Sequence, residues 1–177
     1  MIQLELTRLS GTSEYTFGVM RERMTGFSCR TMERRDPLHW QGIKNYCAVP
    51  AGKYKLRFIA RDNLKLNLQL AVTGTYRNAE LTSESVPYSL SAGSICVGKV
   101  ANHEKGLLEG GEVVLDGIDA WIKQLICDGY ISTKIKTGEM ELVVKYAECY
   151  YYDNRTKNKQ KEKHHEAEAY TMFDFAE

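Results

Sequence analysis

Residues 64–72 read LKLNLQLAV, with a leucine at every second position of the stretch. Leu64, Leu66, Leu68 and Leu70 would share one face of a strand, because successive side chains of a strand point to opposite faces. Lysine, asparagine and glutamine occupy the intervening positions. The stretch therefore predicts a strand with one buried and one solvated face, which is typical of antiparallel sheets.

Several other segments alternate in the same way or follow turn residues. They are 4–9 (LELTRL), 14–23 (EYTFGVMRER), 27–33 (FSCRTME), 53–59 (KYKLRFI) and 139–150 (EMELVVKYAECY). The turns between them contain Thr25-Gly26 and the stretch PAGKY at 50–54. This spacing predicts a meander of short, mostly antiparallel strands.

Residues 111–127 (GEVVLDGIDAWIKQLIC) change the period from two to about 3.6. The apolar residues that recur at helical spacing are Val114, Ile118, Trp121, Ile122 and Leu125. Gly129 stands where a glycine commonly ends a helix. The sequence thus predicts a mainly β (α+β) fold with one amphipathic helix, in a single domain of residues 1–150.

Residues 151–177 are predicted to form a charged tail. The stretch 153–169 is rich in lysine and glutamate and has no apolar residue larger than alanine, which is typical of solvated or disordered segments. We expect its adjacent histidines, at 164 and 165, to face solvent rather than bind a metal. The terminal aromatic residues Tyr170, Phe173 and Phe175 predict an anchor that docks on the domain or on a partner.

Composition narrows the class of protein. The chain of 177 residues has a formal net charge of +1, so no global field would attract nucleic acid or an anionic membrane. Neither a signal peptide nor an apolar run of about 18 residues is recognisable, and we expect a cytoplasmic location. The five cysteines include no CxxC pair, so neither a zinc site nor any other cofactor is expected. Cys29, Cys47 and Cys127 are predicted to be buried.

The stretch SAGSICVG, residues 91–98, is a small-residue turn before a short apolar run. Its residues Gly93, Ser94, Cys96 and Gly98 are predicted to line a cleft. Tyr76 and Arg77, in the long loop that precedes the turn, are predicted to line the same cleft. A turn of this kind can hold a nucleophile, and Cys96 is the candidate.

Several segments, taken in order, resemble an uncharacterised family of small bacterial and phage proteins, commonly regarded as similar in fold to the L,D-transpeptidases. The matching positions are Arg8, Thr16 with Gly18, the stretch TME at 31–33 and the stretch VPAGKY at 49–54, and the stretch GSICVG at 93–98 follows in the family's order. The resemblance covers residues 3 to about 147. It implies an L,D-transpeptidase-like β domain, and an active member would use a cysteine and a histidine.

The departures from the family pattern fall on that chemistry. The family's cysteine, directly after the glycine, corresponds here to Ser94, and Cys96 lies two residues further on. No histidine lies between His39 and His103, although the family carries one on a strand that would end near Val72. A serine without a neighbouring base is an unactivated alcohol.

Two hypotheses of different classes follow. In the first, the chain is a non-catalytic binding or structural module, derived from a phage or mobile element, that recognises a peptide, glycan or protein. In the second, it is a cysteine acyl-transfer enzyme that uses Cys96 with His103 as its base. The missing histidine favours the first.

Overall fold

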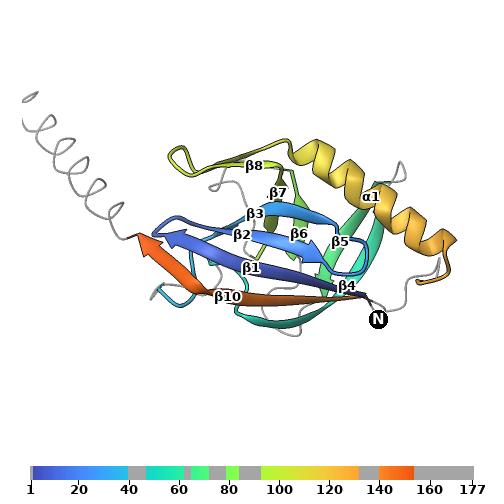
Figure 1. Cartoon of the computed structure of the whole chain (residues 1–177), viewed down its shortest axis with the longest axis horizontal. Helices are drawn as coiled ribbons and strands as arrows, with labels where there is room; N and C mark the ends of the chain where they lie inside the picture. Colours follow the sequence, from blue (N-terminus) through green and yellow to red (C-terminus); the bar gives the residue numbers. More distant parts are fainter. Residues whose placement is uncertain are drawn as a thin grey trace, which may run out of the picture.

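The computed structural model describes residues 2–39, 47–61, 65–71, 79–83, 93–131 and 140–153. Its main element is a closed barrel of eight strands in the order β1-β10-β4-β5-β6-β7-β3-β2 (Figure 1). The strands are β1 (Ile2–Thr12), β2 (Tyr15–Glu22), β3 (Ser28–Arg34), β4 (Gly52–Arg61), β5 (Lys65–Ala71), β6 (Ala79–Thr82), β7 (Ile95–Gly98) and β10 (Met140–Asp153). A small hairpin of β8 (Val100–Asn102) and β9 (Leu107–Glu109) precedes the helix α1 (Gly111–Cys127).

The mainly β fold with one helix is as predicted, and most neighbouring strands are antiparallel. Two neighbouring pairs in the barrel are parallel, namely β1 with β10 and β6 with β7. The first of these joins the two ends of the described chain, with Ile2 opposite Met140. The strand β10 continues to Asp153, beyond the predicted domain boundary at residue 150.

The strand predicted from the alternating leucines forms as β5 and pairs with β4. Leu64 and the side chains of β5 lie outside the described part of the structure, so the predicted leucine face is not described. The inward row of β1 shows the same alternation directly, because Ile2, Leu4 and Leu6 are buried while the residues between them are half-buried.

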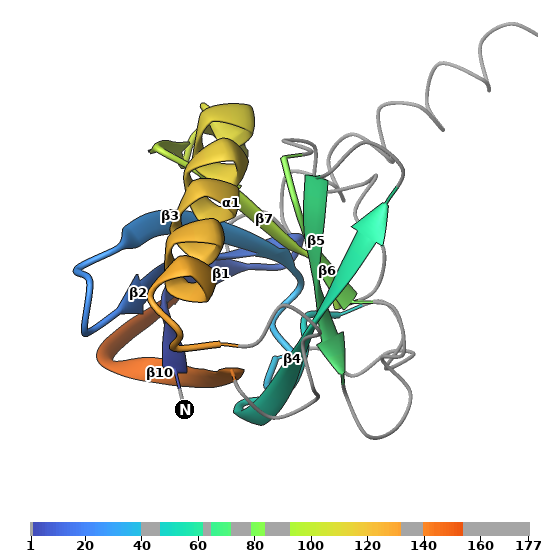
Figure 2. The same ribbon diagram turned by 90° about the vertical axis from the view of Figure 1, so that its right-hand side faces the viewer.

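The helix α1 has the predicted bounds and the predicted buried stripe. Val114, Ile118, Ile122 and Leu125 are buried and belong to the main core cluster. Trp121 is half-buried, and its ring stacks on Phe27 with centroids 5.5 Å apart. Figure 2 shows α1 in front of the strands, with β2, β3 and β10 on one side and β5 and β6 on the other.

Two glycines fix the ends of α1. A Cβ at Gly111 would lie 2.8 Å from the Val97 carbonyl oxygen, so only glycine allows the helix to start this close to β7. At the other end Gly129 has φ 75°, and the Tyr130 N–H donates to the Leu125 carbonyl at 2.9 Å. This left-handed glycine is the predicted helix end.

The inward row of β1 continues with a charged residue, Arg8, which has no exposed surface. Its Nε and Nη2 donate to the two carboxylate oxygens of Glu33 on β3, each at 2.8 Å. Nη2 also donates to the Val49 carbonyl, and Nη1 donates to the Tyr146 hydroxyl on β10 at 3.1 Å. One guanidinium thus connects three strands and the segment before β4.

Three of the positions named for the family resemblance, Arg8, Gly18 and Thr31, lie at or beside this ion pair. Thr31 is buried on β3, two residues from Glu33. A Cβ at Gly18 would lie 2.7 Å from the Thr7 carbonyl oxygen and 2.8 Å from the Thr31 hydroxyl. Arg8, Thr31 and Gly18 therefore have structural roles in the barrel.

We predict that Glu33→Gln lowers the free energy of unfolding by about 3–5 kcal/mol, because it leaves the buried Arg8 charge without a counter-charge. The matched control is Lys53→Gln, which removes an exposed lysine from its pair with Glu141 (3.8 Å). The control should change stability by less than about 1 kcal/mol. Urea titration of both variants measures the difference, and equal losses would contradict the prediction.

Candidate functional site

The predicted cleft residues at 93–98 lie in the core. Gly93 makes a left-handed turn (φ 79°), and Ser94 is 3% exposed. All four residues of β7 are buried, because this strand pairs with β3 on one side and β6 on the other. The turn at Gly93 therefore leads into a strand of the core.

Tyr76 and Arg77 lie outside the described residues, as do Tyr170, Phe173, Phe175, His164 and His165.

Cys96 and His103 both lie near Phe17 but differ in exposure. Cys96 is 0% exposed and belongs to a buried cluster with Phe17 and Met32. His103 is exposed in the turn between β8 and β9, and its ring centroid is 4.2 Å from that of Phe17. A substrate has no access to the Cys96 sulfur in this arrangement.

The other cysteines also differ in exposure, and all five cysteines are free thiols. Cys29 and Cys47 are buried, as predicted, whereas the prediction for Cys127 is wrong because it lies exposed at the end of α1. Burial, and secondarily the nearby Cys96, raises the pKa of Cys29 to about 12. The Cys29 thiol is therefore neutral near pH 7.

A polar cluster occupies the far end of β10. The hydroxyls of Tyr146 and Tyr150 both donate to the buried carboxylate of Asp36, that of Tyr146 at 2.6 Å. Asp36 also accepts the Leu38 N–H at 2.9 Å, and the His39 imidazole lies 3.8 Å from it. These bonds hold the segment after β3 against β10, and the cluster extends the Arg8 network.

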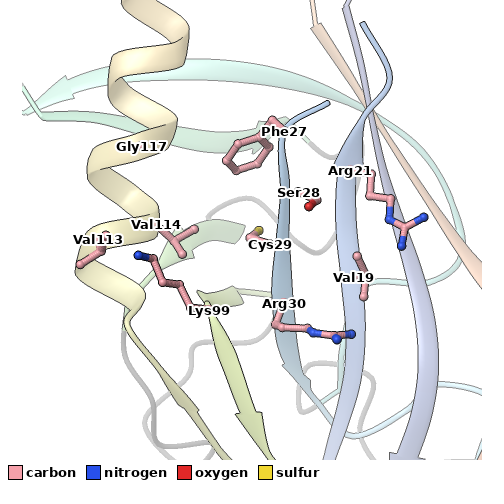
Figure 3. Close-up of a pocket in the computed structure, with 11 residues that line it drawn as sticks. Val19, Arg21, Phe27, Ser28, Cys29, Arg30, Lys99, Val113, Val114 and Gly117 are labelled. Atoms are coloured by element: carbon pink, nitrogen blue, oxygen red, sulfur yellow. The ribbon is translucent and has the colours of Figure 1, made fainter. Parts of the chain in front are cut away.

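A hollow of about 380 Å³ lies between α1 and the hairpin β2–β3 (Figure 3). Its lining residues are Val19, Arg21, Phe27, Ser28, Cys29, Arg30, Gly98, Lys99, Val113, Val114 and Gly117. This volume is within the usual range for small-molecule sites. Gly98 is the one residue of the predicted cleft, among those described, that lines it.

The hairpin register places two arginines on this outer face. Arg21 pairs with Ser28 and Val19 pairs with Arg30, so these four residues lie on the face opposite the buried Met20–Cys29 pair. Figure 3 shows Arg30 extending from β3 toward β2 and Arg21 extending from β2 on the side away from α1, with Val19 between them, while Lys99 extends toward α1. All three cations are exposed.

A buried carboxylate fixes the turn of this hairpin. Glu22 is 3% exposed and accepts the N–H groups of Met24 (2.8 Å) and Thr25 (2.6 Å) and the Thr25 hydroxyl. Burial acts to raise the pKa of Glu22, but these hydrogen bonds outweigh it and lower that pKa below 4.5. The Glu22 N–H donates to the Phe27 carbonyl at 2.8 Å, which places Phe27 at the edge of the hollow.

A second hollow, of about 510 Å³, shares three lining residues with the first: Val19, Arg21 and Arg30. It lies over β1, β2 and β10, and Lys145, Glu5 and Glu148 are its other charged lining residues. The two arginines therefore stand on the border between two hollows.

Within the described residues, no group of three or more histidines, cysteines or carboxylates could hold a metal ion. In that same part of the chain, no helix has both the length and the apolarity to cross a membrane. Comparison with family models, with curated proteins and with solved structures gives no match. The resemblance to the L,D-transpeptidase-like family stays a prediction.

We predict that iodoacetamide modifies Cys127 and Cys149 in the native protein and modifies Cys96 only after unfolding. The reason is access, since Cys127 and Cys149 are exposed and Cys96 is sealed in the core. Peptide mapping by mass spectrometry identifies the modified positions, with the two exposed cysteines as internal controls. Modification of native Cys96 at the rate of Cys127 would contradict the burial of Cys96 and would support the hypothesis of a cysteine acyl-transfer enzyme.

We also predict that stability falls as pH rises above about 10. Burial, and then hydrogen bonding to Asp36, raises the pKa of Tyr150 above its usual 10.0. Tyr150 in the unfolded chain therefore ionises at a lower pH than Tyr150 in the folded chain. Its contribution to the free energy of unfolding is complete below about pH 10 and is lost as the pH rises above that value. Tyr150→Phe should reduce this alkaline loss in urea titrations between about pH 9 and 11, whereas Tyr151→Phe, at a 58% exposed position, should not. An unchanged loss in Tyr150→Phe would refute the assignment.

Proposed function

We propose that the chain is a non-catalytic binding module whose ligand occupies the hollow between α1 and the hairpin β2–β3. The observation that carries this proposal is the lining of the hollow, which combines apolar residues of α1 and the hairpin with exposed cations. The alternative, a cysteine acyl-transfer enzyme, has its candidate nucleophile in the core.

Gly117 has no evident structural reason to be glycine. Its φ is not positive, and a Cβ built on it meets nothing within 4 Å, in contrast to Gly111 at the start of the same helix. A glycine inside a helix destabilises it by about 1 kcal/mol relative to alanine. The space beside Gly117 is therefore open, and a large side chain at this position would enter the hollow that Gly117 lines.

The walls of the hollow suit a small amphipathic ligand. Val113 is 54% exposed, and apolar side chains beside a concave surface are typical of small-molecule sites. The partly buried Phe27 ring is held in place by its stacking on Trp121. Ser28 and the cations supply polar groups on the opposite side, so the hollow offers one apolar and one polar wall.

The lining favours binding over catalysis. Among the described residues of the lining, the potential nucleophiles are Ser28 and Cys29, and none is a histidine or a carboxylate that could act as a base. Cys29 is 7% exposed and its thiol is protonated near neutral pH, as its raised pKa requires. Acyl transfer needs a thiolate or a base-paired hydroxyl. The replacement of the family's cysteine by Ser94 supports the same proposal.

Two substitutions at Gly117 test this function. We expect Gly117→Ala to stabilise the protein by about 0.5–1 kcal/mol in urea titration, because alanine favours the helix. We expect Gly117→Trp to fold normally but to fill the hollow. In ligand-observed NMR with a mixture of neutral, cationic and anionic fragments, some fragments should bind the wild type and Gly117→Ala but not Gly117→Trp.

The result has two clear readings. Fragments displaced by Gly117→Trp alone would support a binding site in this hollow. Failure of every charge class to bind the wild type, or equal binding to Gly117→Trp, would refute it.

A further inference from the structure

We propose that the ligand of this hollow is a small organic phosphate, a phosphomonoester attached to an apolar or aromatic body. This inference rests on the proposed binding function and names its ligand class. Its basis is the pair of arginines, Arg21 and Arg30, at the border of the hollow, together with the apolar wall on α1.

The two guanidiniums have no partner in the described part of the chain. Neither Arg21 nor Arg30 forms an ion pair or a side-chain hydrogen bond with a described residue, and no carboxylate lines the first hollow. Both come from adjacent strands of one hairpin and flank Val19, as Figure 3 shows. Their charges are thus available to an anion that enters from solvent.

Two carboxylates, Glu5 and Glu148, line the second hollow together with these arginines, and Glu5 already has cationic partners. Glu5 lies opposite Arg21 in the β1–β2 register, but its oxygens contact Arg23 at 2.7 Å and Lys145 at 3.0 Å. The hydrogen bond from Lys145, followed by the charges of Lys145 and Arg23, lowers the pKa of Glu5. Arg21 and Arg30 therefore remain in excess on this face, while Arg23 and Lys145 share one carboxylate.

A phosphoryl group matches this pair better than a carboxylate does. An arginine presents a planar fork of donors that suits carboxylate or phosphate oxygens, and one fork satisfies one carboxylate. A phosphomonoester carries nearly two negative charges and three terminal oxygens, so it can accept hydrogen bonds from two forks at once. Lys99, on the α1 side of the hollow, adds a third positive charge at longer range.

The apolar wall of the hollow indicates what the phosphate of the ligand is attached to. Phe27, Val113 and Val114 present ring and methyl groups to the hollow, next to the open space at Gly117. An apolar body of the size of an aromatic ring would contact them while its phosphate reaches the arginines. We therefore expect phenyl phosphate to bind more tightly than inorganic phosphate.

The experiment titrates the full chain, labelled with ¹⁵N, with phenyl phosphate, inorganic phosphate and benzoate. Phenyl phosphate should shift the amide signals of residues 19–21, 28–30 and 113–117 and should bind more tightly than the other two probes. Arg21→Gln and Arg30→Gln should each weaken it about tenfold, the usual size of a lost charge-assisted hydrogen bond. Lys99→Gln should weaken it less.

The matched control is Arg23→Gln, two residues beyond Arg21, whose guanidinium already pairs with Glu5. It should leave the affinity unchanged within about twofold, since such a surface pair contributes little. All four positions are exposed, so thermal melting of the variants should confirm that each one folds.

Three outcomes would overturn the inference. They are equal binding of benzoate and phenyl phosphate, equal binding of inorganic and phenyl phosphate, and a loss of affinity in Arg23→Gln as large as in Arg30→Gln. If neutral fragments bind and are displaced by Gly117→Trp while phenyl phosphate does not bind, the ligand class is wrong and the binding function stands. If no probe or fragment binds, both proposals fail.

Discussion

A fully buried guanidinium constrains the whole barrel. Arg8 is enclosed by the core, and four hydrogen bonds from it reach Glu33, Val49 and Tyr146. Burial acts to lower its pKa, but the adjacent Glu33 carboxylate outweighs this and raises it, so Arg8 stays charged. A buried charge is tolerated only with its partners in place. The strands β1, β3 and β10 must therefore hold one register relative to each other.

This constraint extends from the core to the outer face. β3 alternates, so Cys29 and Thr31 are buried while Arg30 between them points outward. The ion pair at Glu33 and the glycine contact between Gly18 and Thr31 fix the register of β2 against β3. The separation of Arg21 from Arg30 follows from that register. The geometry of the outer face is thus set by groups that no ligand in the hollow would touch.

Periodicity predicted the local elements well, because alternation and helical spacing are properties of neighbouring residues. It did not predict the parallel pairing of β1 with β10, which depends on how distant segments meet. It also did not show that the stretch at 93–98, predicted to line a cleft, contains a buried strand, since a strand buried on both faces shows no alternation. Cys127, by contrast, could have been placed correctly, because it lies two residues from Leu125 and hence off the buried helical stripe.

The candidate site was harder to predict from the sequence than the fold, because it depends on how distant segments pack together. A two-residue turn at Thr25-Gly26 would have paired Arg21 with Arg30, whereas the structure pairs Arg21 with Ser28; both registers place the two arginines on one face. Nothing local connects that face with α1, whose position depends on the close contact of Gly111 with β7. The hollow exists because this contact brings a helix with an open glycine wall beside a hairpin with two arginines. Its chemistry is therefore a property of the tertiary structure, while the motif that drew attention to Cys96 belongs to the core.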